Sequence, residues 1–163
     1  LLEKILKDVK SINVSLKSPV PIFIKIAPDL YKNNIIEILN VCEENGVSGL
    51  IATNTTISSK TLKKPTSFEG GLSGKPLFKP SNNILRLLAK KKNASTALIG
   101  VGGIFSATDI YEKIKMGASA VQIYTSFVYN GPRHVKKMEV ELKKLLLNDG
   151  YSTIDSAVGA LLR

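Results

Sequence analysis

The chain has 163 residues, of which 44% are hydrophobic and 22% are charged, and its formal net charge at pH 7 is +10. This composition is typical of one folded domain and excludes an intrinsically disordered chain. No segment approaches the roughly 20 consecutive apolar residues that a membrane-spanning helix needs, and the charges in the opening residues LLEKILKDVK argue against a signal peptide. With one cysteine, Cys42, and one histidine, His134, we expect no internal disulfide and no metal site.

Lysine accounts for the excess of positive charge, since 20 of the 23 basic residues are lysine. The window from residue 60 to residue 92 holds nine basic residues and one acidic residue, Glu69. Nucleic-acid binding is one interpretation, but the window is poor in interleaved aromatic residues and in the arginines that read bases. A solvated lysine-rich face is the simpler interpretation, so we expect no nucleic-acid partner. An anionic membrane surface or an acidic ligand stays open.

The first half of the chain alternates helix-like and strand-like segments. Apolar residues at helical spacing over residues 2–12 predict an opening amphipathic helix that ends before Pro19. The run over residues 22–26, with Lys25 as its one charge, predicts a strand buried on both faces, as in a parallel sheet. A helix over residues 33–45, with Cys42 in the core, and a second buried strand in GLIATNTT are expected next.

The second half repeats this alternation after a long irregular segment. Residues 57–80 are rich in Gly and Pro and are longer than most connections, which is typical of a lid or a binding loop. Ser81 is expected to cap the helix that follows, and the segment ALIGVGG predicts a strand. Ser106 and Asp109 form the pattern of a capping box, and SAVQIYT predicts the last strand. Helices are expected over residues 135–150 and 153–162.

The predicted order is therefore one helix followed by four strand–helix units. Repeated units of this kind form a parallel sheet, either in a doubly wound fold or in part of a (β/α)₈ barrel. A whole barrel needs about 250 residues, so four units in 163 residues correspond to half of one. We predict an α/β fold in which residues 1–163 form the C-terminal half of a single barrel domain.

Polar residues follow these strands at the edge where both folds bind ligands, the C-terminal ends of parallel strands. Gly102 and Gly103 follow the third strand, and Tyr124 and Thr125 follow the fourth. Glycine lets the backbone approach a phosphate closely, so the two pairs together predict a phosphate site. The glycine pair alone is equally compatible with a tight turn between a strand and a helix.

Lys25 and the cluster Thr53, Asn54 and Thr55 predict a binding site at the first two strands. An ammonium group inside an apolar strand is costly unless it meets an anion or water, and a strand-edge lysine that reaches solvent is the alternative. The Thr–Asn–Thr cluster suits a planar polar ligand, although such residues also form turns. Asp29 is expected to cap the next helix, and no pair of carboxylates at the strand ends marks a general base.

Several motifs in the same order resemble the dihydroorotate dehydrogenase family, and the resemblance covers nearly all of the chain. They are KIAPDL at 25–30, ATNTT at 52–56, GGLSGKPL at 70–77, IGVGGIFS at 99–106, GASAVQIYTSFVYNGP at 117–132 and the final DSAVGALLR. The forms GLSGKPL and YTSFVYNGP resemble the membrane-associated, quinone-using class 2 enzymes rather than the soluble class 1 enzymes. The pair Phe68 and Glu69 departs from the polar residue that the family more often carries there.

The resemblance implies the second half of an FMN-binding (β/α)₈ barrel. It implies an oxidoreductase of de novo pyrimidine (UMP) biosynthesis that oxidises dihydroorotate to orotate and passes electrons through FMN to a quinone. It implies that Lys25 stabilises negative charge on reduced FMN, that Thr53 contacts FMN, and that Asn54 and Thr55 bind the substrate. The remaining FMN contacts that it implies are Ser73, Gly74, Gly102, Gly103, Tyr124 and Thr125.

The resemblance also implies what lies outside this chain. In the family, the catalytic base (a serine in class 2) and the helices that form the quinone tunnel and contact the membrane belong to the N-terminal half. We therefore expect no catalytic base in this chain, a requirement for the N-terminal half as a partner, and no activity of the chain alone. A peripheral position on the mitochondrial inner membrane is expected, with the bacterial inner membrane as the alternative.

Two alternative functions stay open. One is a class 1 dihydroorotate dehydrogenase or another barrel oxidoreductase that binds FMN or phosphate. The more remote one is a basic, non-enzymatic binding module that uses the lysines of residues 60–92.

Overall fold

The computed structural model describes residues 1–58, 62 and 69–163. In this part of the chain, four parallel strands form one sheet in the order β1 (Phe23–Ile26), β2 (Gly49–Ala52), β3 (Ala97–Val101) and β4 (Ala120–Gln122). The helices are α1 (Leu2–Val14), α2 (Lys32–Glu44), the 3₁₀ helix η1 (Lys75–Leu77), α3 (Phe78–Lys91), α4 (Ala107–Lys115), α5 (Thr125–Asn130), α6 (Pro132–Asn148) and α7 (Ile154–Ala157). The predicted alternation of strands and helices is confirmed.

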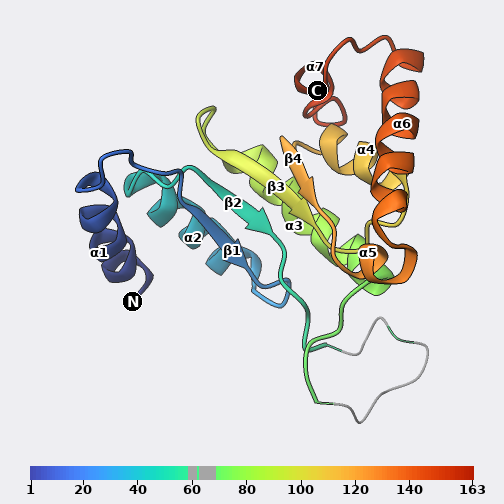
Figure 1. The fold of residues 1–163 in the computed structure, drawn as a ribbon. Coiled ribbons are helices and arrows are strands. Elements are labelled where there is room, and N and C mark those ends of the chain that lie inside the picture. The colour runs from blue at the N-terminus through green and yellow to red at the C-terminus, as the bar shows by residue number, and fades with distance from the viewer. Residues whose placement is uncertain (59–61, 63–68) are drawn as a thin grey trace.

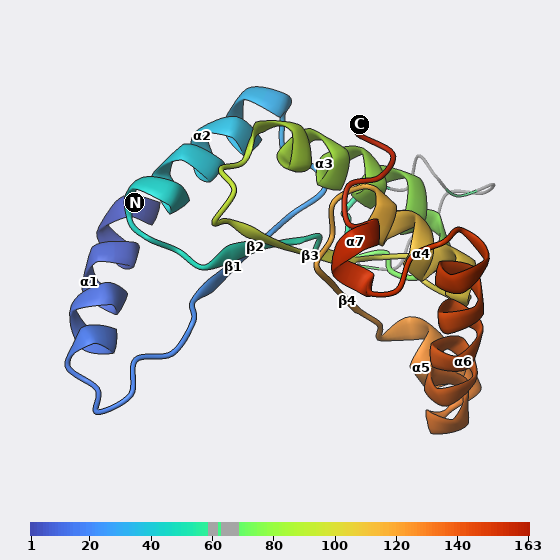
Figure 2. The ribbon, with the colours of Figure 1, turned by 90° about the horizontal axis from the view of Figure 1, so that it is seen from above.

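The placement of the helices decides between the two fold classes that the sequence left open. Seen from above, α1, α2, α3, α4 and α6 follow an outer arc, and the strands lie along its inner side (Figures 1 and 2). A doubly wound sheet would carry helices on both faces and would reverse its strand order. Sequential strands with helices on one side are the arrangement of a barrel wall. The chain therefore has the α/β architecture of half a (β/α)₈ barrel.

The two faces of the sheet differ in burial, because side chains alternate along each strand. On the outer face, Leu50 and Leu98 are in register and have no exposed surface. On the inner face, Lys25 is in register with Ile51, and Lys25 is exposed. The prediction of a first strand buried on both faces is therefore wrong for this chain, because no described element covers the inner face.

Two apolar cores hold the helices in place. The first lies between the outer face of the sheet and helices α1 to α3, and it includes Leu39, Leu85 and Cys42. Cys42 is fully buried there, as expected, and burial raises the pKa of its thiol to about 11. The second core joins α4, α6 and α7 through Ile114, Met138 and other apolar residues.

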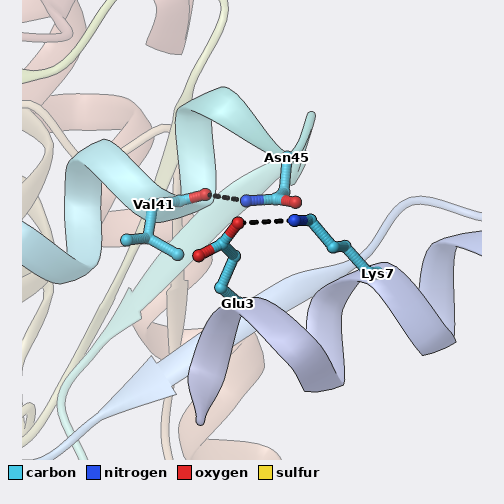
Figure 3. Close-up of polar contacts among 4 residues, drawn as sticks. All are labelled: Glu3, Lys7, Val41 and Asn45. Carbon is cyan, nitrogen blue, oxygen red and sulfur yellow. Dashed lines mark hydrogen bonds and ion pairs between the residues drawn. The ribbon is translucent and has the colours of Figure 1, made fainter.

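Helix α1 covers the end of the first core and packs against α2. Leu6 is its buried residue, while Glu3 and Lys7 form an ion pair of 2.6 Å one turn apart. Figure 3 shows this pair facing the end of α2, where Asn45 Nδ2 donates a hydrogen bond of 2.8 Å to the carbonyl of Val41. The ion pair is exposed, so its contribution to stability is small. Among the described residues, no helix is both long and apolar enough to cross a membrane.

Three helix boundaries differ from the sequence predictions. Helix α3 begins at Phe78, three residues before the expected cap Ser81, because η1 runs directly into it. The six-residue helix α5 was not expected, since its sequence TSFVYN shows no helical apolar period. Helix α7 is only four residues long, within the ten expected. Of the irregular segment 57–80, residues 59–61 and 63–68 lie outside the described residues, and with them Phe68.

Candidate functional site

A pocket of about 470 Å³ lies at the C-terminal ends of the four strands. Its volume falls in the range of about 300–1,000 Å³ that is usual for small-molecule and cofactor sites. All ten residues that the sequence singled out for the cofactor and substrate line it: Lys25, Thr53, Asn54, Thr55, Ser73, Gly74, Gly102, Gly103, Tyr124 and Thr125. Residues up to 100 positions apart in the sequence thus meet in one place.

Strand β1 contributes Lys25, whose side chain lies on the inner face of the sheet. It is exposed and lines the pocket. The Lys25 ammonium group is not buried, contrary to the expectation, because no element of the described residues covers the inner face. Lys25 therefore lines the pocket next to the end of β2, because it is in register with Ile51 of that strand.

The Thr–Asn–Thr cluster lies in the irregular segment that directly follows β2. Thr53 is buried, and its amide donates to the carbonyl of Val101 over 3.3 Å. The Asn54 amide donates to the carbonyl of Ile26 over 2.7 Å, and Asn54 Oδ1 accepts a hydrogen bond of 2.9 Å from the amide of Thr55. Strand ends β1 and β3 therefore hold this segment from both sides, which leaves the exposed side chains of Asn54 and Thr55 at the pocket.

Both ends of the long segment after β2 are tied to the site. Thr56 and Leu72 exchange two backbone hydrogen bonds of 3.1 and 2.7 Å in an antiparallel bridge. Asp29 accepts hydrogen bonds from the Thr56 hydroxyl and from the amide of Ile57. Asp29 was expected to cap α2, which is wrong: Tyr31 occupies the cap position, and Asp29 instead joins the loops after β1 and β2.

The returning segment places Ser73 and Gly74 against the end of β4. Thr125 Oγ1 and Ser73 Oγ are 3.1 Å apart in a hydrogen bond. Gly74 has a φ of +81°, and a Cβ atom there would lie 3.1 Å from Thr125 Cγ2. The pairs Ser73–Gly74 and Tyr124–Thr125 therefore form one side of the pocket together.

Gly102 and Gly103 form the turn after β3, and both have positive φ, +104° and +72°. A Cβ atom on Gly103 would lie 2.5 Å from the backbone nitrogen of Phe78, so only glycine fits between β3 and the start of α3. Ser106 then caps α4 by accepting from the Asp109 amide over 3.1 Å, as expected. The Asp109 carboxylate accepts a hydrogen bond of 2.8 Å from the amide of Phe105. A full capping box would require it to accept from the amide of Ser106 instead.

Tyr124 and Thr125 lie at the start of α5, beyond β4 itself. Strand β4 ends at Gln122, so the predicted strand over SAVQIYT is shorter than expected. Tyr124 is exposed, whereas Ser126 in the same turn is buried. The two pairs predicted to form a phosphate site thus lie in the turn after β3 and at the start of a short helix after β4, and both line the pocket.

The charges around the pocket favour an anionic ligand. Lys25 is the one ionisable side chain with a positive charge among its described lining residues, and none of those residues is a carboxylate. The other polar lining groups are hydroxyls and amides, which suit a ligand with several hydrogen-bonding edges. Within the described ranges, no group of three or more His, Cys, Asp and Glu side chains could hold a metal ion.

Comparison with known proteins decides the family. A family model described as dihydroorotate dehydrogenase matches residues 1–146. The chain belongs to the dihydroorotate dehydrogenase family. The resemblance stated from the motifs is therefore confirmed.

Relatives of the same family match nearly the whole chain. A dihydroorotate dehydrogenase (quinone) from Christiangramia forsetii is 44% identical over 142 residues, which are 86% of this chain and 42% of that protein. One from Cereibacter sphaeroides is 42% identical over 159 residues, 97% of this chain and 45% of that protein. The chain thus spans less than half the length of these curated relatives.

Solved structures of the family confirm the fold. The crystal structure of DHODH from Eimeria tenella in complex with ferulenol matches with a TM-score of 0.92 and 32% identity, over 99% of this chain and 48% of that chain. The ligand-free form from the same organism matches with a TM-score of 0.92, 34% identity and half of its length. The prediction of half a barrel is in agreement with this coverage.

The pocket also contains residues that the sequence did not single out. Gln122, Phe105 and Ser126 line it. Gln122 could have been found, because an amide inside an otherwise apolar strand stands out next to a polar strand end. Ser126 and Phe105 gave no such signal, since their places follow from the turn after β3 and from helix α5.

Proposed function

We propose that the complete protein carrying this chain is a class 2 dihydroorotate dehydrogenase. It would oxidise dihydroorotate to orotate in pyrimidine biosynthesis, with FMN as cofactor and a quinone as electron acceptor. Membership of the family and the curated relatives named dihydroorotate dehydrogenase (quinone) support this proposal. The observation that carries it here is the single pocket lined by all ten residues that the resemblance implies.

The pocket fits FMN in its chemistry. It offers a lysine ammonium, several hydroxyls and a glycine turn, with no carboxylate among its described lining residues, which suits a ligand with a phosphate. We propose that Gly102, Gly103, Tyr124 and Thr125 hold the phosphate, with Ser73 and Gly74 beside them. When bound, FMN supplies the acceptor for the two electrons that leave the substrate.

Lys25 and Thr53 would contact the flavin ring. An ammonium group placed beside an atom that gains negative charge stabilises that charge, which is electrostatic catalysis. Lys25 projects from the inner face of β1 into the pocket and can take this place. The amide of the buried Thr53 donates to the carbonyl of Val101, and its hydroxyl donates to the carbonyl of Asn54 over 3.0 Å. Thr53 would therefore contact the flavin mainly through its backbone at the end of β2.

Asn54 and Thr55 would bind dihydroorotate and orotate. Both side chains are exposed at the pocket, and the hydrogen bond from the Thr55 amide to Asn54 Oδ1 directs the amide group of Asn54. An amide and a hydroxyl at neighbouring positions match the alternating carbonyl and N–H groups of a pyrimidine ring. We propose that the base that removes the substrate proton comes from the N-terminal half of the barrel, which would also bring the quinone to the flavin.

The alternative enzymes would use a different electron acceptor, and the alternative binding module would use none. The relatives named with quinone favour class 2 over class 1 and over other barrel oxidoreductases. A basic binding module has less support, since the pocket already accounts for the motifs. Salt-dependent nucleic-acid binding without bound flavin would favour that module.

A peripheral position on an inner membrane follows from the proposed quinone. The bacterial relatives support the bacterial inner membrane, and the mitochondrial location stays a prediction. Fractionation of cells that express the complete protein tests this: the enzyme should sediment with membranes and be released by detergent.

The proposed activity is tested on the complete protein by its flavin spectrum. Dihydroorotate should bleach the oxidised-flavin absorbance without oxygen, and a quinone, but neither fumarate nor NAD, should restore it. Lys25→Ala should slow the bleaching by about a hundredfold, the loss typical of one electrostatic contact to the transition state. Lys32→Ala, an exposed lysine of α2 outside the pocket, is the matched control and should leave the rate unchanged. An unchanged rate in Lys25→Ala would show that the assigned role of Lys25 is wrong.

A further inference from the structure

Lys113 on α4 is buried completely. It has no exposed surface and is the largest side chain of the described residues to be buried to this degree. Its ammonium group donates hydrogen bonds of 2.8 Å to Ser81 Oγ and 2.6 Å to Asn82 Oδ1, and lies 3.4 Å from the carbonyl oxygen of Val101. The Phe78 ring centroid is 5.2 Å away. Such burial of a lysine is costly and calls for a compensating interaction.

No carboxylate contacts this ammonium group directly among the described residues. Glu112 is held by Asn82 Nδ2 over 3.1 Å, and Asp109 is held by the amide of Phe105 over 2.8 Å. Burial lowers the pKa of Lys113 to about 8, while Glu112 and Asp109 act from a distance to raise it. At neutral pH the group is therefore still charged, and its charge is only partly compensated.

The ammonium group lies directly behind the glycine turn of the pocket. It contacts the carbonyl oxygen of Val101, and Ser81 Oγ links it to the carbonyl of Gly102 over 3.3 Å. A Cβ atom on Gly100 would lie 3.0 Å from Cδ of the lysine. Val101, Gly102 and Gly103 form part of the pocket wall, and Lys113 does not line the pocket, so the cation lies on the other side of that wall from the pocket.

We propose that Lys113 is a positioning residue that adapts the Gly102–Gly103 turn to a phosphate group. From behind the wall it holds the carbonyls of Val101 and Gly102, directly and through Ser81, so that the backbone amides of the turn can face the pocket. Its positive charge also favours the phosphate dianion across a thin layer of backbone, where solvent screens little. This inference rests on the proposed function, because it assumes that FMN places its phosphate at this turn.

A purely structural role makes a different prediction. If Lys113 only filled the space between α3, α4 and β3, its loss would loosen the pocket for any flavin. If it acts on the phosphate, its loss weakens FMN and leaves riboflavin, which has the same ring and no phosphate, unaffected. The ratio of the two affinities therefore separates the roles.

The test uses the complete protein, stripped of flavin, and measures the dissociation constants of FMN and riboflavin by fluorescence titration at pH 7. In Lys113→Met we expect FMN affinity to fall about tenfold or more, the usual scale for a hydrogen-bonded charge, and riboflavin affinity to change less than about twofold. Lys115→Met is the matched control: this half-buried lysine on the same helix pairs with Asp149 over 3.5 Å, away from the pocket. It should leave both affinities unchanged.

Equal losses for FMN and riboflavin in Lys113→Met would overturn the inference and leave the proposed function intact. A wild-type protein that binds neither flavin, or that binds both equally, would overturn the phosphate site itself and the inference with it. If Lys113→Met does not fold, Ser81→Ala cuts the link to Gly102 and keeps the cation. It should lower FMN affinity about threefold without affecting riboflavin, and an equal effect on both flavins would again refute the inference.

Discussion

Two lysines show how far the surroundings of a residue set its chemistry. Lys25 lies on the inner face of β1, is exposed, and lines the pocket directly. Lys113 is enclosed between α3, α4 and β3, with no exposed surface, and meets the pocket wall from behind. Burial lowers the pKa of Lys113 from the ordinary 10.5 to about 8 because the charged form is desolvated.

The pKa of Lys113 predicts how its contribution to stability changes with pH. Between about pH 8 and 10.5 the unfolded chain binds a proton at this residue and the folded chain does not, so the free energy of unfolding rises with pH there. The lowering of the pKa from 10.5 to about 8 corresponds to a rise of about 3 kcal/mol in the free energy of unfolding. Urea unfolding at several pH values should show the stability of wild type relative to Lys113→Met rising over this window.

The comparison with the variant is needed because other groups titrate in the same range. The pKa of the Cys42 thiol is raised to about 11, so its contribution to stability falls as pH rises towards that value. This contribution is present in both proteins and cancels in the difference. A difference that stays flat from pH 8 to 10.5 would contradict the burial of Lys113 as a charged group.

At the scale of elements, the site depends on how closely β3 approaches α3. The turn after β3 passes the first residue of α3 so tightly that a Cβ atom on Gly103 would lie 2.5 Å from the Phe78 backbone nitrogen. The Phe78 amide cannot move aside cheaply, because it donates a hydrogen bond to the carbonyl of Lys75 in η1. The short distance between these two elements therefore fixes the position of the glycine turn in the pocket.

Gly103→Ala should be much more destabilising than a matched glycine substitution elsewhere. Gly150 has a φ of +80°, close to the +72° of Gly103, but a Cβ atom on it would meet nothing within 4 Å. Gly150→Ala should cost about 1 kcal/mol of unfolding free energy from backbone strain alone. Gly103→Ala should cost about 3 kcal/mol or more, because the clash adds to the strain, and should also weaken FMN binding. Denaturant unfolding and flavin titration measure both effects; equal losses in the two variants would contradict the clash.

The elements also show where prediction from sequence succeeds. Helices α2 and α6 have strong apolar periods, and their expected ranges agree with the structure within about three residues. The start of α3 was placed too late because Ser81 has the side chain of a cap, although its one hydroxyl proton is shared between the carbonyls of Phe78 and Gly102. Helix α5 could not be predicted, since six residues are too few to show a period.

The site likewise has features that could be predicted from the sequence and features that could not. Its general location was predictable, because parallel strands place their polar ends on one edge of the sheet. The exposure of Lys25 was not, because an apolar strand does not reveal whether its second face is covered. Lys113 was not predictable either: in the helix sequence it reads as one more lysine of a charged face, and only the packing of α3 behind the glycine turn buries it.

At the scale of the whole molecule, the described part of the sheet has two unpaired edges and an uncovered inner face. In the described residues, β1 and β4 each pair with one strand, and the inner face carries exposed or half-buried residues. Unpaired strand edges tend to pair with other chains. The four-stranded sheet therefore presents surfaces that a closed barrel would cover.

We expect the 163-residue chain alone to self-associate, to hold FMN weakly and to have no dehydrogenase activity. Size-exclusion chromatography with light scattering, together with the flavin absorbance of the eluted protein, measures the first two properties. The complete protein is the control and should elute with stoichiometric FMN. A stable 163-residue monomer loaded with flavin would contradict this prediction.

The order of the strands has a further consequence for how the chain tolerates changes in length. Each strand pairs with its neighbour in sequence, at separations of 49 − 23 = 26, 97 − 49 = 48 and 120 − 99 = 21 residues. The entropy of closing a loop grows only with the logarithm of its length, about 0.6 kcal/mol for each doubling. The longer connection between β2 and β3 therefore adds little to the entropy cost of folding. The Thr56–Leu72 bridge brings two points of this connection together beside the pocket. Insertions and deletions between these two residues are the changes that this sheet should accommodate most readily.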